Sequence, residues 1–549
     1  MVSQTWDDHD RSDRTAARDF GKNYLSSVDK NGIIFVNGDN DTFPLWYAQE
    51  VEGYRTDVKV INLSYLSTDW YAHQSQHPTY EAPAIDMYSS FKDYGNDGMS
   101  YCYVKPVAPN SMALAKDAFK NMHSNPEHIF TTDYIYIPVD RNKVIENNVV
   151  EKSKSNAITD SLMVRIGNRG GLSLNQSLPL DMIAKSAENG WNRPIYFACT
   201  VPDSYHLGLT PYLQQTGMAY QVTPALTGSE DSPGINTEKM YDVIMNKYLW
   251  GGLDKGKDLY LDETVRRMVS TTRRTMINLA EELYYQGVDS TGNKENLDKS
   301  RKVLNLLEAK LPTSVMPYEG YTGIDVADIY LKLSNVTGNK DDKARALAIA
   351  EKELARYAKF VPYLNSLKDW QLKTIAYSEK NVILHAIPNF LRIYKQAGGD
   401  VDKKLSELGI SMDSILSICP RLGHDVTMLA NYMIDDERND AIIKFFVDYN
   451  LNLKDRMSYI VNHFARLGNS QEETFDLLAK PLAKYNAEIQ LMPYVLSYYV
   501  YEKDYPTEKA IESTVNVFSK HGSDANKLKD IIIKTLTQAS SEENETAQE

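Results

Sequence analysis

The clearest pattern in the chain is a short apolar run at residues 33–36 that stops at the polar turn Gly-Asp-Asn-Asp of residues 38–41. A helical pattern of apolar positions follows the turn, and a second apolar run occupies residues 58–63. The apolar positions of that helical pattern are Phe43, Trp46, Tyr47 and Val51. Strand, turn, helix and strand in this order predict a βαβ unit with parallel strands. Because ligands of open α/β sheets bind beyond the carboxyl ends of the strands, the turn lies where a ligand is expected.

Other polar segments are predicted to meet this turn. Residues 12–27 have the apolar stripe of a helix, and a helix that leads directly into a strand runs antiparallel to it. Residues 6–11 are therefore expected at the carboxyl end of the first strand. Residues 64–71 follow the second strand. Residues 194–200 indicate another buried strand, whose following turn, residues 201–206, joins the same edge if the strand is parallel.

The pattern changes from mixed to helical along the chain. Strands are also predicted at residues 134–139 and 162–166, with helices at 111–122 and 180–187 and a loop at 224–236. From about residue 261 only helical patterns occur. We therefore expect an N-terminal α/β domain with a mainly parallel, Rossmann-like sheet, followed by an all-α TPR-like helical-repeat domain. The expected domains are residues 1–250 and 251–539, and the acidic tail 540–549 is expected to be disordered.

An internal similarity supports the repeat. The segment from Leu283 to Arg301 resembles the segment from Ile329 to Arg345, each with a Thr-Gly-Asn-Lys turn, at an offset of about 46 residues. That offset is typical of two-helix repeats. The repeat region also has two arginine pairs, at residues 266–267 and 273–274. We expect these arginine pairs to lie on a solvent-exposed helix face. The alternative is that they bind an anionic partner or the acidic edge of the α/β domain.

Composition narrows the class of protein. With 549 residues the chain is too long for a single core. A net charge of −14 argues against nucleic acid as a partner, because phosphate binding requires basic surface. No apolar run approaches the roughly 20 residues that cross a bilayer, and the polar start is not a signal peptide. The three cysteines form no CxxC motif, which excludes a zinc ribbon.

The acidic edge is the candidate site, because the sequence lacks the P-loop, dinucleotide-binding, zinc-protease and α/β-hydrolase motifs. Its candidate ligand-binding residues are Trp6, Asp7, Asp8, His9, Asp10, Arg11, Asp39, Asn40, Asp41, Thr42, Trp46, Asp69 and Trp70. Carboxylates beside indole rings suit a sugar or a peptide. Carboxylates with one imidazole also suit a divalent metal, although no cofactor is expected. The structural alternative is that these carboxylates cap helices and pair locally with Arg11.

Several long motifs carry a resemblance to a known family. They are Trp-Asp-Asp-His-Asp-Arg at 6–11, Asn-Gly-Asp-Asn-Asp-Thr-Phe-Pro-Leu-Trp-Tyr at 37–47, Gln-Glu-Val-Glu-Gly at 49–53, Arg-Thr-Asp-Val at 55–58, Trp-Asn-Arg-Pro-Ile-Tyr-Phe-Ala at 191–198, Tyr-Leu-Gln at 212–214, Gly-Met-Ala-Tyr at 217–220, Met-Tyr-Asp at 240–242 and Trp-Gly-Gly at 250–252. The chain resembles the soluble C-terminal region of the domain-of-unknown-function 2723 family. These are the protein-O-mannosyltransferase-like membrane glycosyltransferases of Bacteroidota, glycosyltransferase family 117.

The resemblance implies a transmembrane bundle before this region, on the same or another chain, and a location on the periplasmic side of the inner membrane. It also implies that the transferase centre lies in the membrane part, so Met1 is interpreted as an introduced start of a fragment. We therefore expect an accessory region that binds glycan or acceptor polypeptide at the acidic edge and protein partners on the helical repeats. Two alternatives are a free-standing metal-dependent hydrolase or transferase that uses the same carboxylates, and a non-catalytic scaffold.

Overall fold

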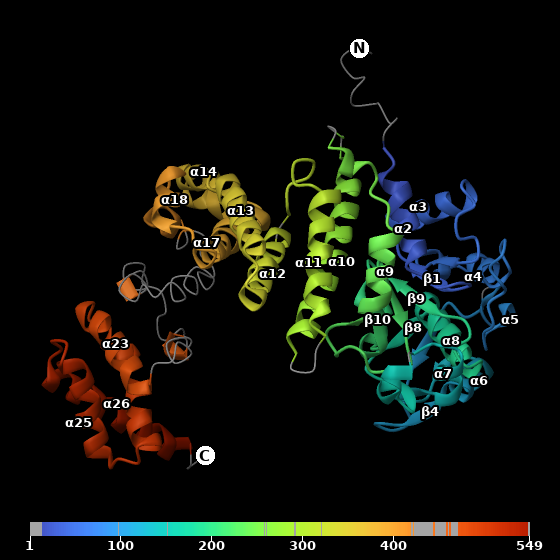
Figure 1. Ribbon diagram of the computed structural model, residues 1–549. Coiled ribbons are helices and arrows are strands. Elements are labelled where there is room, and N and C mark those ends of the chain that lie inside the picture. The colour runs from blue at the N-terminus through green and yellow to red at the C-terminus, as the bar shows by residue number, and fades with distance from the viewer. Residues whose placement is uncertain are drawn as a thin grey trace. The chain divides into compact units, whose positions relative to one another are not determined.

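The computed structural model describes two compact units, Met1–Thr322 and Gly323–Glu549. Within them it describes residues 14–96, 98–150, 152–256, 259, 261–289, 293–319, 321–418, 421, 443–444, 457–458, 460–462 and 470–546. The first unit is an α/β structure with mixed sheets, and the second is helical (Figure 1). Of the described helices, none is both long enough and apolar enough to cross a membrane.

The first unit is built on a six-stranded mixed sheet with the order β12-β10-β11-β9-β1-β2. Its strands are β1 (Ile33–Val36), β2 (Lys59–Asn62), β9 (Ile195–Ala198), β10 (Leu213–Gln215), β11 (Ala219–Val222) and β12 (Gly234–Ile235). Strands β9, β1 and β2 are parallel to one another. Strand β11 is antiparallel to both β9 and β10, whereas β12 is parallel to β10. All residues of β1, β2 and β9 are buried, as expected for strands covered on both faces.

The βαβ prediction is confirmed by α3 (Asp39–Glu50), which connects β1 to the parallel strand β2. Helix α2 (Ala16–Ser26) packs against α3. The two helices approach closely at Gly21, where a Cβ atom would overlap the carbonyl of Pro44. The buried strand predicted within residues 194–200 is also present as β9, and it is parallel to β1, since Ile195 pairs with Ile33.

Two three-stranded sheets complete the strands of the first unit, with orders β5-β3-β8 and β4-β6-β7. Their strands are β3 (Tyr101–Val104), β4 (Met112–Leu114), β5 (Ile129–Phe130), β6 (Tyr134–Pro138), β7 (Ser161–Arg165) and β8 (Gly171–Ser173). The strands predicted at residues 134–139 and 162–166 are thus present. They pair antiparallel with each other in a separate sheet instead of extending the main one.

The remaining described α-helices of the first unit are α4 (Asp69–Gln76), α5 (Phe91–Tyr94), α6 (Ala115–Ser124), α7 (Arg141–Glu146), α8 (Leu174–Glu188), α9 (Thr237–Asn246), α10 (Glu263–Val288) and α11 (Glu295–Lys310). Short 3-10 segments are η1 (Tyr65–Ser67), η2 (Lys152–Ala157), η3 (Asp203–Tyr205), η4 (Thr210–Tyr212) and η5 (Leu253–Lys255). Helix α10 packs on α2 and α9, so the expected boundary at residue 250 lies inside this unit.

The environment of Arg273 on α10 contradicts both interpretations of its arginine pair, a solvated helix face and a docking surface. Its side chain is 1% exposed, and its guanidinium donates to the carbonyls of Leu311, Met316 and Pro317 at 2.8, 2.6 and 3.1 Å. The residue therefore fastens the chain after α11 to α10, and it lies neither on a solvated face nor on a docking surface.

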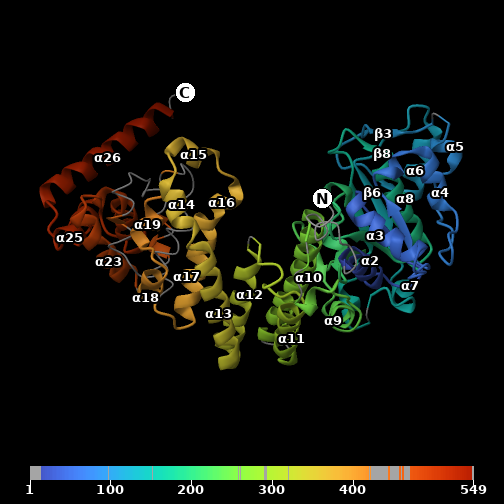
Figure 2. The same cartoon turned by 90° about the horizontal axis from the view of Figure 1, so that it is seen from above.

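The described helices of the second unit are α12 (Thr322–Thr337), α13 (Lys340–Tyr357), α14 (Phe360–Ser366), α15 (Asp369–Thr374), α16 (Tyr377–Asn381), α17 (Ile387–Gln396), α18 (Val401–Glu407), α19 (Met412–Leu416), α23 (Gln471–Lys484), α24 (Met492–Ser497), α25 (Thr507–Ser519) and α26 (Ala525–Thr546). Helical turns η6 (Val382–Ala386), η8 (Glu488–Gln490) and η9 (Tyr498–Glu502) lie between them. The view from above shows the same elements (Figure 2).

Both copies of the internal similarity contain two consecutive helices, α10 and α11 in the first copy and α12 and α13 in the second. In the second pair, Gly338 has a φ of +71°, and the Asn339 side chain caps α13 through the backbone N–H groups of Asp341 and Asp342. At the other end of the unit, α26 continues to Thr546, so residues 540–546 are helical where a disordered tail was expected. Residues 547–549 lie outside the described part.

Candidate functional site

The turns after β1, β2 and β9 meet at the carboxyl edge of the parallel strands, and we call these turns the rim. Ser64 Oγ, after β2, donates to Asn37 Oδ1, after β1, at 3.1 Å. The Thr200 hydroxyl, after β9, donates to the carboxylate of Asp41 at the start of α3. The predicted convergence of polar turns therefore occurs, and direct hydrogen bonds hold it.

Asp41 and Thr42 have their partners inside the protein. Thr42 is fully buried; its hydroxyl donates to Gly38 O at 2.7 Å and accepts from Asn62 Nδ2 at 2.8 Å. Asp41 is also buried, and burial raises its pKa to about 6 while the hydrogen bond from Thr200 lowers it. These contacts tie the three strand ends together, which is a structural task.

The other predicted rim residues have different surroundings. Asp39 and Asn40 are exposed on the first turn of α3. Asp69 accepts hydrogen bonds from the backbone N–H groups of Trp70 and Asn96 at 2.7 and 3.3 Å. The residues Trp6, Asp7, Asp8, His9, Asp10 and Arg11 lie outside the described part. Among described residues, no group of three or more His, Cys, Asp or Glu is placed to hold a metal ion.

An aromatic groove lies beside the rim, with a volume of about 700 Å³. The groove is lined by Trp46, Gln49 and Glu50 of α3, by Thr56, Val58, Lys59 and Val60 of the β2 segment, by Tyr65, Trp70, Tyr71, Gln74 and Ser75 of η1 and α4, and by Thr79 and Tyr80. Two of the predicted residues, Trp46 and Trp70, thus belong to the groove. The other described residues that the sequence analysis proposed for the site, Asp39, Asn40, Asp41, Thr42 and Asp69, do not line it.

The aromatic rings of the groove pack against one another, and part of their surface remains exposed to solvent. Trp46 stacks with Tyr65 at a centroid distance of 6.2 Å and an interplanar angle of 25°. Trp70 meets Tyr71 edge to face at 5.5 Å and remains 58% exposed. The hydroxyl of Tyr80 donates to Glu50 across the groove. Rings held in this way present apolar faces to a ligand at little cost in conformational entropy.

Lys59 supplies a polar anchor at the floor of the groove. Its ammonium donates to His77 O at 2.6 Å and to Thr79 Oγ1 at 2.5 Å, and burial lowers its pKa to about 8. An ammonium has three donors, and the described residues accept two of them. The third is available to a ligand oxygen.

The edge strand β2 forms the floor, but its backbone is largely occupied. Asn62 N–H donates to Tyr71 Oη at 3.0 Å, and Val58 C=O accepts from Gln49 Nε2 at 2.7 Å. Side chains of α4 and α3 therefore cap the edge of the strand at both ends. Addition of an extended peptide strand requires a run of open backbone groups, so the groove suits a ligand that binds through rings and side chains.

Sequence reasoning missed most of the groove, including Lys59, Tyr65, Tyr71 and Tyr80. The available signal was helical spacing, because Trp46 and Glu50 are four residues apart, as are Trp70 and Gln74. This spacing places each pair on one helix face, beside the strand between the two helices.

The comparisons with known proteins concern this unit. Residues 17–240 match the family model described as TMEM260-associated domain 2. The match begins in α2 and ends in α9, so it includes the described part of the rim and the aromatic groove. No curated protein and no solved structure matches the chain. Over these residues the chain is similar to a domain associated with TMEM260.

Proposed function

We propose that this chain is the accessory recognition region of a protein-O-mannosyltransferase-like membrane glycosyltransferase, and that the aromatic groove binds glycan. The observation that carries the proposal is the groove itself, in which Trp46, Tyr65 and Trp70 lie beside a buried ammonium and two side-chain amides. Aromatic faces contact the C–H faces of a pyranose, and polar side chains bond its hydroxyls. The family match is compatible with a region of this kind.

The transferase chemistry is assigned to a membrane part outside this chain, on the periplasmic side of the inner membrane. In this proposal the parallel strands β9, β1 and β2 act as a Rossmann-like support that fixes α3 and α4, and with them the groove. The second unit acts as a TPR-like scaffold for protein partners. The similarity between the α10–α11 and α12–α13 pairs supports a repeat of this type.

The test of groove binding is a titration of the full chain with a panel of neutral oligosaccharides, followed by calorimetry and tryptophan fluorescence. We expect the Trp46→Ala, Trp70→Ala double variant to lose at least tenfold in affinity, because two stacking faces disappear. Trp370→Ala is the matched control, since Trp370 is 65% exposed in the second unit and outside the groove. Equal affinities in the wild type and the double variant would exclude the groove as the site.

A further inference from the structure

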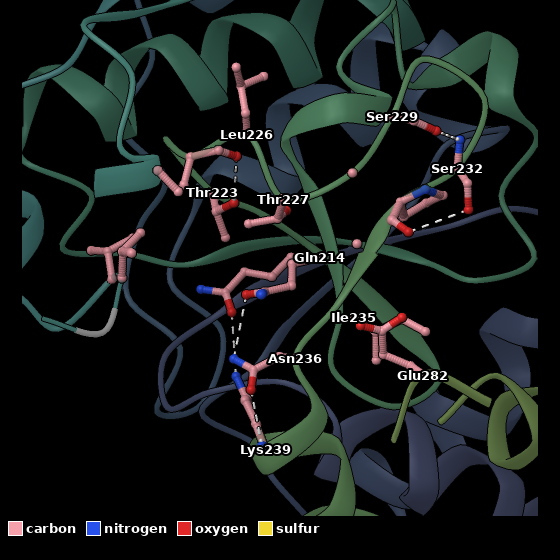
Figure 3. A pocket seen from close by; sticks show the side chains of 18 of the residues that line it. Gln214, Thr223, Leu226, Thr227, Ser229, Ser232, Ile235, Asn236, Lys239 and Glu282 are labelled. Atoms are coloured by element: carbon pink, nitrogen blue, oxygen red, sulfur yellow. Dashed lines mark hydrogen bonds between the residues drawn. The ribbon is translucent and has the colours of Figure 1, made fainter. Parts of the chain in front are cut away.

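A second, polar pocket of about 880 Å³ lies at the other edge of the main sheet, beside β10, β11 and β12 (Figure 3). Its walls come from these strands, from the loop before β12, and from α9 and α10. Gly234 of β12 pairs with Gln214 of β10, and a Cβ atom at Gly234 would overlap the Thr227 carbonyl, so the loop before β12 packs directly against this strand. The volume is that of a site for a small ligand.

Two buried glutamines on the sheet point to a ligand. Gln214 and Gln221 lie opposite each other in the antiparallel β10–β11 pair, so their side chains share one face. They are only 8% and 6% exposed, and both line the pocket. Figure 3 shows Gln214 close to Asn236 in the interior of the pocket.

The amide oxygens of these glutamines are bonded, whereas their nitrogens are not. Asn236 Nδ2 donates to Gln214 Oε1 at 3.4 Å, and Lys239 Nζ donates to Gln221 Oε1 at 3.5 Å. These donors fix which end of each amide is the oxygen. Among the described residues, no acceptor meets either Nε2 group. Both Nε2 groups are open to the pocket, so oxygen atoms of a ligand can accept from them in place of water.

The charges around the pocket favour a neutral ligand. Its lysine is already neutralised, because Lys239 Nζ lies 2.6 Å from Asp29 Oδ2 and 3.0 Å from Tyr196 Oη. Glu282 adds one further negative charge to the lining. A phosphate or nucleotide therefore finds no unpaired cation among the described lining residues.

The remaining lining matches hydroxyl groups. Thr223, Thr227, Ser229 and Ser232 also line the pocket. The hydroxyls of Thr223, Thr227 and Ser232 donate to backbone carbonyls, and their oxygens can still accept from a ligand. The described lining contains no aromatic ring, unlike the groove. An added peptide strand would pair with the sheet edge, but β12 offers only two residues there. A saccharide satisfies donors and acceptors from any direction, because each hydroxyl is both.

We propose that this pocket is a second saccharide site, separate from the aromatic groove, in which Gln214 and Gln221 donate to sugar oxygens. The two sites differ in chemistry, since one has rings and a lysine and the other has amides and hydroxyls. They also lie at opposite edges of the same sheet. The proposal holds whether or not the groove binds glycan.

The experiment uses the full chain carrying Trp46→Ala and Trp70→Ala, so that the groove does not contribute. Maltotriose, cellotriose, chitotriose and mannotriose are the probes, with binding followed by saturation-transfer NMR and calorimetry. We expect at least one trisaccharide to bind. Adding Gln214→Leu and Gln221→Leu should weaken that binding at least tenfold, because both amide donors to the sugar are removed. The melting temperature should fall only modestly, since Asn236 Nδ2 loses one long hydrogen bond and Lys239 keeps its contacts with Asp29 and Tyr196.

Gln215→Leu is the matched control on the same strand. Gln215 is equally buried, but its Nε2 already donates to Gly217 O at 3.0 Å. This variant should lower the melting temperature and keep the affinity. If the double glutamine variant does not fold, Gln214→Met alone makes the same comparison. Binding that survives the glutamine substitutions, absence of binding by all four probes, or selective binding of a serine-rich and threonine-rich peptide would each overturn the proposal.

Discussion

The rim and the aromatic groove share the same strands and helices, yet their polar groups are used differently. At the rim, the side chains of Asp41, Thr42 and Asn62 bond to other parts of the protein. In the groove, ring faces and one donor of Lys59 are left open. A position at the carboxyl edge of a parallel sheet is therefore not sufficient evidence of a binding residue. Groups without an internal partner are the better indicator.

The comparison predicts that the largest stability losses come from buried polar groups with internal partners. Arg273→Met should lower the free energy of unfolding by about 3–5 kcal/mol, because the buried carbonyls of Leu311 and Met316 and the carbonyl of Pro317 lose a charged donor. Urea unfolding measures this loss. Arg267→Met on the same helix is the control: Arg267 is exposed and pairs with Glu263, so its loss should stay within about 0.5 kcal/mol. Equal losses in the two variants would contradict the structural role of Arg273.

Asn62 tests the rim directly. Its Nδ2 donates to Thr42 Oγ1 at 2.8 Å, and its Oδ1 accepts from Tyr65 N–H at 3.0 Å. Asn62→Leu should cost about 1–3 kcal/mol, since it removes both bonds and leaves the N–H of Tyr65 without its acceptor. The shift of the urea midpoint at constant slope measures the loss. Asn40→Leu makes the same change at an exposed position of the rim. A larger loss at Asn40 would mean that exposed rim residues hold the fold.

Asp41 gives the rim a pH dependence. Its folded-state pKa of about 6 lies above that of an unfolded aspartate. The folded protein therefore binds this proton more tightly, and the contribution of Asp41 to stability falls as the pH rises from about 4 through 6. Asp41→Asn removes this pH-dependent contribution. As the pH rises from about 4 to 6, the stability of the variant relative to the wild type should therefore increase by about 1–2 kcal/mol. The helix N-terminus favours the charged carboxylate and offsets part of the cost of its burial.

Chemical unfolding of both proteins at pH 4.0, 5.0, 6.0 and 7.5 measures the difference. Asp39→Asn removes a negative charge at an exposed position of the same first helix turn and controls for the effect of the helix dipole. A stability difference between wild type and Asp41→Asn that does not change with pH would show that burial does not govern this carboxyl.

The elements that depend on local pattern could be predicted from the sequence, whereas long-range pairings could not. The β1–α3–β2 unit follows from two apolar runs around a helical pattern, and β9 follows from its own apolar run. Strands β10, β11 and β12 were missed because their two to four residues include Gln or Gly and form no apolar run of the kind seen in β1 and β9. Their antiparallel pairing makes the sheet mixed, and it depends on contacts that a local pattern does not encode.

The prediction of site residues is limited in the same way, because burial and hydrogen-bond partners depend on long-range contacts. The sequence identified Trp46 and Trp70 as residues near a sheet edge, but Lys59 looked like an ordinary strand residue because its burial comes from α4 and the following loop. Arg55 illustrates the converse. It belongs to a conspicuous motif, yet its guanidinium donates to Leu25 O and Val28 O and closes the end of α2. A conspicuous motif and a binding role are therefore separate properties, and only the hydrogen-bond partners distinguish them.

The smallest effect on stability is expected in the groove. Trp70→Ser should lower the free energy of unfolding by at most about 1 kcal/mol, because the ring is 58% exposed and its main described contact is the edge of Tyr71. The same substitution at Trp370 gives the reference for an exposed indole outside the groove. A loss at Trp70 as large as that of Arg273→Met would show that the ring belongs to the folded core. The groove would then be a structural seam, and the contrast with the rim would fail. A small loss together with weakened oligosaccharide binding would identify Trp70 as a residue whose principal contact is a ligand.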